Sequence, residues 1–442
     1  MASEARIPIG LWSEIKAGQR WANEGVSRVI GFLVEGAATG GKYIFHIVVP
    51  NGVAETVRED LRQLNAGEGR DWRVWEPSVE EEAELVRKGG HPSESAADLI
   101  ARFANQAVPV EGWVVTFPHF SGALKLDKPK ATLFPDALPY DFQLGWPDGS
   151  WEPDRGWPAW RETATDVMAD SDAVITFSRH VADRHAGPLC GVPIDKIRVI
   201  PLAPPDLAPQ LPFLKDRRQT PASREKAANL LRSFADDRGI HYLKDFPFEE
   251  VNFVTAATQD RPSKNLGLTA DAVRFLVREK RQSMKLILTA QLHFDADWSR
   301  LPILVSKDQL HRDILSLPDL PRAVHAALFH CATIVVHSSF FEGIVGALPF
   351  YEAASVGTPS LLARGPHVDE LLALEPDLKS FTYDPYDFRQ LAGLIGMIAA
   401  DREAAVQEQA GIFERLSRNT WSDVASGYAE AALEGGLRQR ER

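Results

Sequence analysis

The sequence has very little cysteine and no long apolar run. Its 442 residues include two cysteines, Cys190 and Cys331, too few for a disulfide framework or a cysteine-based zinc site, so we expect buried thiols in a reducing compartment. No stretch of about 18 apolar residues occurs, and the first ten residues hold no apolar signal core. We therefore expect a cytoplasmic protein that does not span a membrane but is compatible with peripheral contact at its inner face.

An excess of basic residues is also absent. Lys and Arg number 49 against 61 Asp and Glu, which gives a formal net charge of −12. Such a chain repels nucleic-acid phosphates, so we expect no nucleic-acid partner. An anionic substrate must therefore bind at a local group of positive side chains.

Short apolar runs alternate with amphipathic segments through most of the chain. This alternation is typical of parallel strands joined by covering helices and predicts an α/β protein. In the first half, the predicted strands are 7–12, 43–49, 113–117, 131–134, 173–177 and 197–201, and the predicted helices are 25–35, 54–64, 93–106, 157–169 and 180–185. In the second half, the predicted strands are 251–258, 285–290, 302–305, 332–339 and 359–363, with helices at 223–236, at 348–355 and from Tyr386 onward.

A proline-rich and basic stretch separates the two alternating series. We expect a first Rossmann-like domain over residues 1–205, a linker or insertion over 206–250 and a second Rossmann-like domain over 251–420. Two such domains facing each other form a deep cleft at the carboxyl ends of their strands, where these folds bind ligands.

A glycine-containing loop follows the strand predicted at 332–339. The segment HSSFFEGIVGALPFYEAASVGTPSLLA (337–363) places Gly343, Ile344, Val345 and Gly346 between this strand and the predicted helix. Glycines at a strand-to-helix junction let main-chain amides approach a phosphate closely, and the helix dipole favours the negative charge. The loop therefore suits a nucleoside diphosphate, although a tight turn without a ligand explains the same spacing.

Two carboxylates and two cations accompany this loop. Glu342 precedes the loop and Glu352 lies within the helix, and carboxylates accept hydrogen bonds from sugar or ribose hydroxyls. In TAATQDRPSKNLGL (255–268), Arg261 and Lys264 lie between a strand and a helix. A guanidinium and an ammonium stabilise the negative charge that develops on a leaving diphosphate.

These motifs resemble those of the retaining family-four glycosyltransferases (glycosyl transferases group 1), which have the GT-B fold. The family signature E-G-F-G-x-P-x-x-E-A, followed by G-T-P, is matched by Glu342-Gly343, Gly346, Pro349, Glu352-Ala353 and Gly357-Thr358-Pro359. Arg261, Lys264 and Asn265 match its R-x-x-K-N pattern. Nine residues separate the two glutamates here, against seven in the family.

The resemblance implies a retaining, metal-independent hexosyltransferase with no resident cofactor. Arg261 and Lys264 would bind the donor phosphates, Glu342 the sugar hydroxyls and Glu352 the ribose. The first three residues are thus the catalytic candidates. Gly25 would also belong to the donor site, because GVSRVIGFL (25–33) is similar to a G-I-G-R-Y helix start of one family branch.

The resemblance also implies partners and an architecture. The co-substrate would be a GDP- or UDP-linked sugar, and the acceptor a glycan or lipid-linked glycan in surface polysaccharide assembly. The segment 421–442 resembles the family's C-terminal end and would return to the N-terminal, acceptor-binding domain.

Loops after two N-terminal strands supply the acceptor candidates. His119 lies in FPHFSGAL (117–124), and Asp136 lies in TLFPDALPYDF (132–142), where Pro135 replaces a family histidine. A histidine hydrogen-bonded within its own loop is an equally good interpretation of His119. Four nearby tryptophans suit either stacking on sugars or a self-packed loop: Trp146, Trp151, Trp157 and Trp160.

Two rival interpretations stay open. Asp295 and Asp297 form an Asp-x-Asp string after a strand, which can hold a divalent metal against a diphosphate in a metal-dependent glycosyltransferase. The lengthened glutamate loop and the missing loop histidine instead favour a non-catalytic carbohydrate-binding relative.

Overall fold

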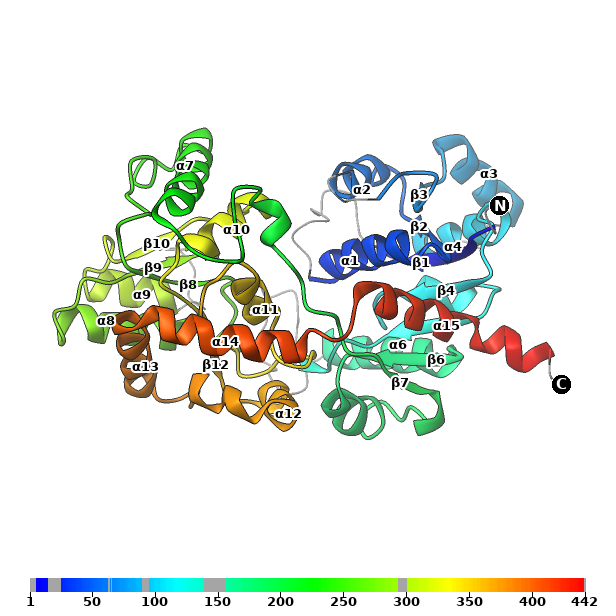
Figure 1. Ribbon diagram of the computed structural model, residues 1–442. Coiled ribbons are helices and arrows are strands. Elements are labelled where there is room, and N and C mark those ends of the chain that lie inside the picture. Colours follow the sequence, from blue (N-terminus) through cyan, green and yellow to red (C-terminus); the bar gives the residue numbers. More distant parts are fainter. Residues whose placement is uncertain are drawn as a thin grey trace. The chain divides into compact units, whose positions relative to one another are not determined.

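The computed structural model describes residues 5–14, 25–62, 64, 66–89, 95–138, 156–292 and 300–440. The chain divides into two units, each built around its own parallel sheet (Figure 1). Unit 1 comprises Met1–Ala137, Trp151–Ala203 and Asn419–Arg442, and unit 2 comprises Leu138–Ser150 and Pro204–Arg418. The α/β class that the alternating pattern predicts is confirmed.

In the described part of unit 1, seven parallel strands pair in the order β3-β2-β1-β4-β5-β6-β7. Their bounds are β1 Ile7–Trp12, β2 Tyr43–Val48, β3 Trp72–Trp75, β4 Gly112–Val115, β5 Lys130–Leu133, β6 Ala173–Thr176 and β7 Ile197–Val199. Central strands β4, β5 and β6 are buried throughout. Burial on both faces explains why the sequence shows continuous apolar runs rather than alternation.

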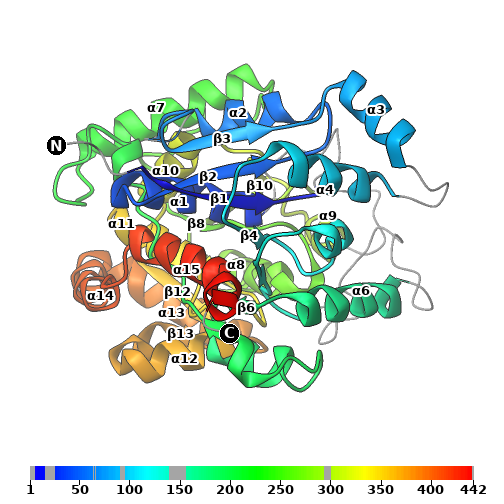
Figure 2. The same ribbon diagram turned by 90° about the vertical axis from the view of Figure 1, so that its right-hand side faces the viewer.

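The helices of unit 1 cover both faces of this sheet. They are α1 Gly25–Gly40, α2 Ala54–Leu61, α3 Val79–Gly89, α4 Ala96–Ala107, α6 Gly156–Asp170 and α15 Trp421–Arg440, with a π-helical turn at Val181–Ala186 and 3₁₀ turns at Ser121–Lys125 and Ile194–Lys196. Helix α15, from the far end of the chain, packs against α1 and against β4, β5 and β6 (Figure 2).

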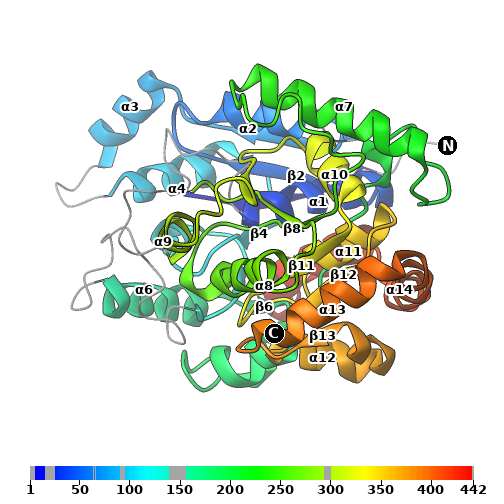
Figure 3. The same cartoon turned by 90° about the vertical axis from the view of Figure 1, so that its left-hand side faces the viewer.

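In the described part of unit 2, six parallel strands pair in the order β10-β9-β8-β11-β12-β13. Figure 3 labels four of them, β8, β11, β12 and β13. Their bounds are β8 Phe253–Ala256, β9 Lys285–Leu288, β10 Ile314–Ser316, β11 Ile334–His337, β12 Ser360–Ala363 and β13 Thr382–Tyr383. The chain runs from β8 outward to β10 and then returns to β11 on the other side of β8. This reversal creates a switch point between β8 and β11, where open parallel sheets bind ligands.

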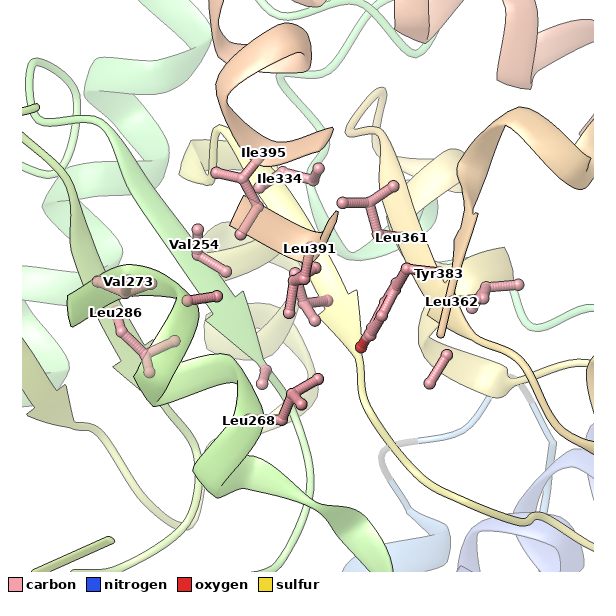
Figure 4. Close-up of a cluster of buried hydrophobic side chains, with 14 of the residues drawn as sticks. Val254, Leu268, Val273, Leu286, Ile334, Leu361, Leu362, Tyr383, Leu391 and Ile395 are labelled. Carbon is pink, nitrogen blue, oxygen red and sulfur yellow. The ribbon is translucent and has the colours of Figure 1, made fainter. Parts of the chain in front are cut away.

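Helices cover both faces of the second sheet as well. They are α7 Pro221–Asp237, α8 Leu266–Arg278, α9 Arg300–Lys307, α10 Arg322–Cys331, α11 Leu348–Ser355, α12 Pro366–Leu374, α13 Phe388–Ala400 and α14 Arg402–Leu416, with 3₁₀ turns at Ala208–Gln210, Pro262–Lys264 and Pro376–Phe381. Helices α8 and α13 pack together over one apolar cluster, which includes Val254, Leu286 and Ile334 from the sheet (Figure 4). Helices α7 and α10 pack over a second cluster, around Phe253 and Val335.

The strand predicted at 302–305 is wrong, because these residues lie in helix α9. Leu301, Leu304 and Val305 are buried, whereas 59% of Ile303 is exposed. Buried residues spaced by three and four positions define one helix face, and a run of four apolar residues is too short to show that period. The third strand of the sheet is instead β10, which follows α9.

The stretch expected as a linker or insertion is part of unit 2. Residues 204–250 contain α7, whose Leu231 and Phe234 are buried in the α7–α10 cluster. Elsewhere, both cysteines are buried free thiols, as expected. Among the described residues, no helix is long and apolar enough to cross a membrane.

The contact between α1 and α15 depends on Gly36. A Cβ atom at this position would lie 2.1 Å from the carbonyl oxygen of Trp421, a separation that no side chain can occupy. Gly31 lies in the same helix, but a Cβ there would meet only Leu64 Cδ1, at an ordinary 3.7 Å.

We therefore predict opposite effects for two alanine substitutions in α1. Gly36→Ala should lower the free energy of unfolding by about 1–3 kcal/mol because α15 must shift. Gly31→Ala should raise it by roughly 0.5–1 kcal/mol because alanine favours helix. Urea unfolding followed by tryptophan fluorescence measures both, and equal effects of the two variants would contradict the close packing of α15.

Candidate functional site

The candidate site lies where β8 and β11 end side by side. The two strands are parallel neighbours, with Ile334 opposite Val254 and Val335 opposite Thr255. Because parallel strands end at the same edge of a sheet, the loops after Ala256 and His337 emerge together. These are the loops that carry the predicted cations and the predicted carboxylate–glycine motif.

The cationic segment after β8 folds into a tight turn. A 3₁₀ turn spans Pro262–Lys264, and the Lys264 amide donates to the Arg261 carbonyl at 2.9 Å. Asn265 follows in the left-handed conformation (φ 50°), which asparagine tolerates better than most residues, and helix α8 begins at the next residue. Arg261 and Lys264 are both half-buried at this turn.

Hydrogen bonds join the loop after β8 to the loop after β11. The Ser338 hydroxyl donates to the Lys264 carbonyl at 2.7 Å, and the Phe340 amide donates to the Ser263 carbonyl at 3.0 Å. The side chains then meet directly, because Lys264 Nζ lies 2.7 Å from Glu342 Oε1. The structure thus brings together one predicted cation and one predicted carboxylate that are 78 residues apart.

Glu342 is held as a carboxylate. Burial by itself raises its pKa, but the Lys264 ammonium and a hydrogen bond with His337 outweigh burial and hold the pKa well below its usual range. His337 Nε2 lies 3.1 Å from Glu342 Oε1, the same oxygen that Lys264 contacts. Lys264 and Glu342 remain partly exposed, at 18% and 22% of their side chains, so a ligand can reach the pair.

The loop from Gly343 to Gly346 leads directly into α11. Gly346 adopts φ +74°, and its amide donates to the His367 carbonyl at 2.8 Å. A Cβ at Gly346 would lie 2.8 Å from Leu371 Cδ2, so both backbone and space favour glycine. Ile344 and Val345 are half-buried between the two glycines. No side chain caps the start of α11 among the described residues. Pro349 carries no N–H and the Phe350 amide donates to the Ala347 carbonyl at 3.1 Å, so Leu348 supplies the first-turn amide that could meet an anion.

Glu352 occupies a different environment. It lies on α11, its side chain is fully buried, and its Oε2 is 3.6 Å from His325 Nε2 of α10. His325 is 17% exposed and packs edge-on against Phe329, with ring centroids 4.5 Å apart. A ligand reaches the Glu352 carboxylate only if a covering side chain moves, so its contact with ribose stays a prediction.

The remaining predicted site residues belong to unit 1. Gly25 is the exposed first residue of α1. His119 follows β4, and the Trp160 indole N–H donates to its Nδ1 at 3.3 Å. Although His119 is partly exposed, packed rings such as Phe117, at 5.1 Å, desolvate the imidazole and lower its pKa to about 4. Asp136 is half-buried in the segment after β5.

Several sequence-based candidates lie outside the described residues. These are Asp295 and Asp297 of the possible metal site, with Trp146 and Trp151 of the aromatic segment. Trp160 lies in α6, within the helix predicted at 157–169, rather than in a self-packed loop. Within the part of the chain that the structure describes, no three His, Cys, Asp or Glu side chains gather where they could hold a metal ion.

Two histidines of this region, His325 and His337, are not among the residues that the sequence predicts for the site. Each lies within hydrogen-bonding or near-contact distance of a predicted carboxylate. His337 carried a usable signal, because it lies within the strand predicted at 332–339 and precedes Glu342 by five positions. His325 carried no signal in the sequence, because only the packing of α10 beside α11 brings it close to Glu352.

Three solved structures show the same fold over almost their whole length. HepE from Anabaena, in complex with UDP-glucose, is 14% identical, with a TM-score of 0.65 over 98% of this chain and 100% of that chain. Sucrose-phosphate synthase from Thermosynechococcus elongatus is 14% identical, with a TM-score of 0.64 over 99% of each chain. Trehalose 6-phosphate synthase from Burkholderia multivorans is 12% identical, with a TM-score of 0.60 over 98% of this chain and 100% of that chain.

These likenesses identify the fold. The chain has the two-sheet α/β architecture of the GT-B glycosyltransferases, as the sequence predicts. No protein-family model matches the sequence, and no curated protein matches it either.

The ion pair leads to a prediction about pH. The folded-state pKa of Glu342 lies below the unfolded value of about 4.3. The carboxylate therefore stabilises the fold above that unfolded value, and this contribution is lost as pH falls through the lower folded-state pKa. Glu342→Gln should lower the melting temperature at pH 7, and the gap to wild type should narrow as the pH falls below about 4.

Glu414→Gln is the matched control, because Glu414 is an exposed residue on α14. Thermal unfolding across a pH series measures both variants. A Glu342→Gln deficit that stays constant down to low pH would contradict the depressed pKa.

Proposed function

We propose that this protein is a glycosyltransferase that moves a hexose from a nucleotide sugar to a glycan or lipid-linked glycan with retention of configuration. The observation that carries the proposal is the ion pair of Lys264 and Glu342 at the switch point of the second sheet, beside the Gly343–Gly346 loop. The GT-B fold and the complex of HepE with UDP-glucose support a nucleotide-sugar donor. The retaining outcome rests on the family resemblance of the two motifs.

The donor diphosphate binds between the cationic turn and the start of α11. Lys264 and Arg261 supply positive charge from one side, and the Leu348 amide with the helix dipole at the start of α11 acts from the other. Both features are built into rigid elements before the ligand arrives. Such preorganised donors stabilise charge that develops in a transition state more effectively than water does.

The two glutamates bind hydroxyl groups of the donor. Glu342 is ionised and partly exposed, so it accepts a hydrogen bond from the transferred sugar. Glu352 binds the ribose once the side chains that cover it have moved. A sugar on one side and a nucleoside on the other thus flank the diphosphate.

The reaction needs no covalent intermediate. The bond between the sugar C1 and the phosphate oxygen breaks, and a bond from C1 to the acceptor oxygen forms on the same face. The departing phosphate oxygen takes the acceptor proton, so charges and atoms balance without a metal ion. Arg261 and Lys264 stabilise the negative charge left on the diphosphate.

The acceptor binds to unit 1, through His119 and Asp136. At neutral pH the His119 imidazole is uncharged, because its pKa is lowered to about 4. It therefore takes part as a hydrogen-bonding group rather than as a cation. The protein acts in the cytoplasm, peripherally at the inner face of the membrane where a lipid-linked acceptor resides.

Loss of Lys264 tests the proposal directly. Lys264→Ala should lower the turnover number by about 10²–10³-fold, because a preorganised charge that stabilises the leaving group is lost. Release of nucleoside diphosphate from a panel of UDP- and GDP-sugars, with excess chelator throughout, measures this effect. Lys307→Ala, at the exposed end of α9, is the control. Wild-type activity in Lys264→Ala, or no turnover by wild type with any donor and acceptor, would overturn the assignment.

The ribose role of Glu352 has its own test. Glu352→Gln keeps the side-chain volume but removes the charge, so the affinity for UDP or GDP should fall by about 1.5–3 kcal/mol, as for a hydrogen bond to a charged group. Isothermal titration calorimetry with each nucleotide measures the change. An unchanged dissociation constant in a folded variant would remove Glu352 from the ribose site.

A further inference from the structure

His337 is a buried side chain fixed on several sides. It is the last residue of β11, with 6% of its side chain exposed, and its carbonyl accepts a hydrogen bond from the Tyr383 hydroxyl at 3.1 Å. Its ring centroid lies 5.6 Å from that of His367, at an interplanar angle of 72°. The ring is therefore held in one place, with Nε2 directed at Glu342.

The contact defines which nitrogen carries the proton. An ionised carboxylate has no proton to donate, so the hydrogen between His337 Nε2 and Glu342 Oε1 belongs to the histidine. Nδ1 is buried and has no hydrogen-bond partner among the described residues. A proton on Nδ1 would be a buried N–H without a partner, which is costly, so the Nε2–H tautomer fits this environment.

The two donors contact one oxygen of the Glu342 carboxylate and leave the other oxygen for a ligand. Lys264 Nζ and His337 Nε2 both contact Oε1, at 2.7 and 3.1 Å. In the described part of the chain, no group donates to Oε2. Since 22% of the Glu342 side chain is exposed, Oε2 is the oxygen left to accept a hydrogen bond from a ligand.

We propose that His337 is a positioning residue, which holds Oε1 of Glu342 so that Oε2 accepts a hydroxyl group of the transferred sugar. The proposal rests on the proposed function. His337 touches neither sugar nor phosphate in this arrangement and acts through Glu342. Lys264 alone does not fix the carboxylate plane, because one contact to one oxygen still permits rotation, and the second donor removes that freedom.

Paired substitutions separate positioning from a structural role. His337→Leu removes the donor, whereas His337→Gln places an amide N–H near the position of Nε2. With the better donor of UDP-glucose and GDP-mannose, His337→Leu should lower the turnover number for nucleoside diphosphate release about tenfold or more, and His337→Gln should recover most of it. The dissociation constant for UDP or GDP should stay within about twofold in both, because the phosphate contacts are unchanged.

The matched control is His241→Leu, at an exposed histidine of the same unit. Unchanged turnover in His337→Leu would overturn the proposal. So would an equal loss of turnover and nucleotide affinity, or a failure of the glutamine variant to recover activity, because each indicates a packing role.

A spectroscopic measurement tests the contact without any activity. In ¹⁵N NMR spectra of histidine-labelled wild type near pH 7, the resonances that vanish in His337→Gln should be those of the Nε2–H tautomer, and Glu342→Leu should shift them. An Nδ1–H tautomer would overturn the positioning proposal even if the enzyme is active. The expected tautomer in a protein that neither binds nor turns over any sugar nucleotide would instead overturn the proposed function, and the sugar role of Glu342 with it.

Discussion

The parallel pairing of β8 with β11 is the constraint on which the candidate site depends. It sets the loops at 257–265 and 338–347 side by side. Hydrogen bonds from the Ser338 hydroxyl and the Phe340 amide then hold the second loop against the first. Only in this frame does the short contact between Lys264 and Glu342 form. Both side chains are largely buried, so removal of one partner leaves the other charge uncompensated. Under the proposed function, the pair would also order two ligand-binding groups in advance.

Much of the fold could be predicted from the sequence, because strands buried on both faces appear as continuous apolar runs. Helix α11 begins where its pattern predicts, at Leu348. Short elements were missed for a physical reason. Strand β3 reads Trp-Arg-Val-Trp among charged residues, and β10 spans three residues, so neither offers the length that a periodic pattern needs.

The site could be predicted in part. Glycines at a strand-to-helix junction, acidic residues beside them and a cationic turn are local signals, and the structure brings Lys264 to Glu342 as a shared site requires. What the sequence does not contain is the orientation of each side chain. The contact of His337 with Oε1, and the burial of Glu352 beside His325, follow from the packing of β11 and α10 against α11. Such pairings join distant segments and carry no local pattern.

Glu342 and Glu352 differ in exposure, and this difference decides how each side chain can contact a ligand. Lys264 and His337 contact Oε1 of the ionised Glu342 carboxylate, and its side chain is partly exposed, so under the proposed function Oε2 would meet a ligand hydroxyl without rearrangement. Glu352 exposes none of its side chain, so a contact with ribose requires a change at or near His325. If the open form is only a fraction of the population, the measured nucleotide affinity is lower than the intrinsic affinity by that same fraction. Under the proposed function, the sugar and phosphate contacts would thus be ready in advance, whereas the nucleoside contact would depend on a movement within unit 2 that ligand binding itself must drive.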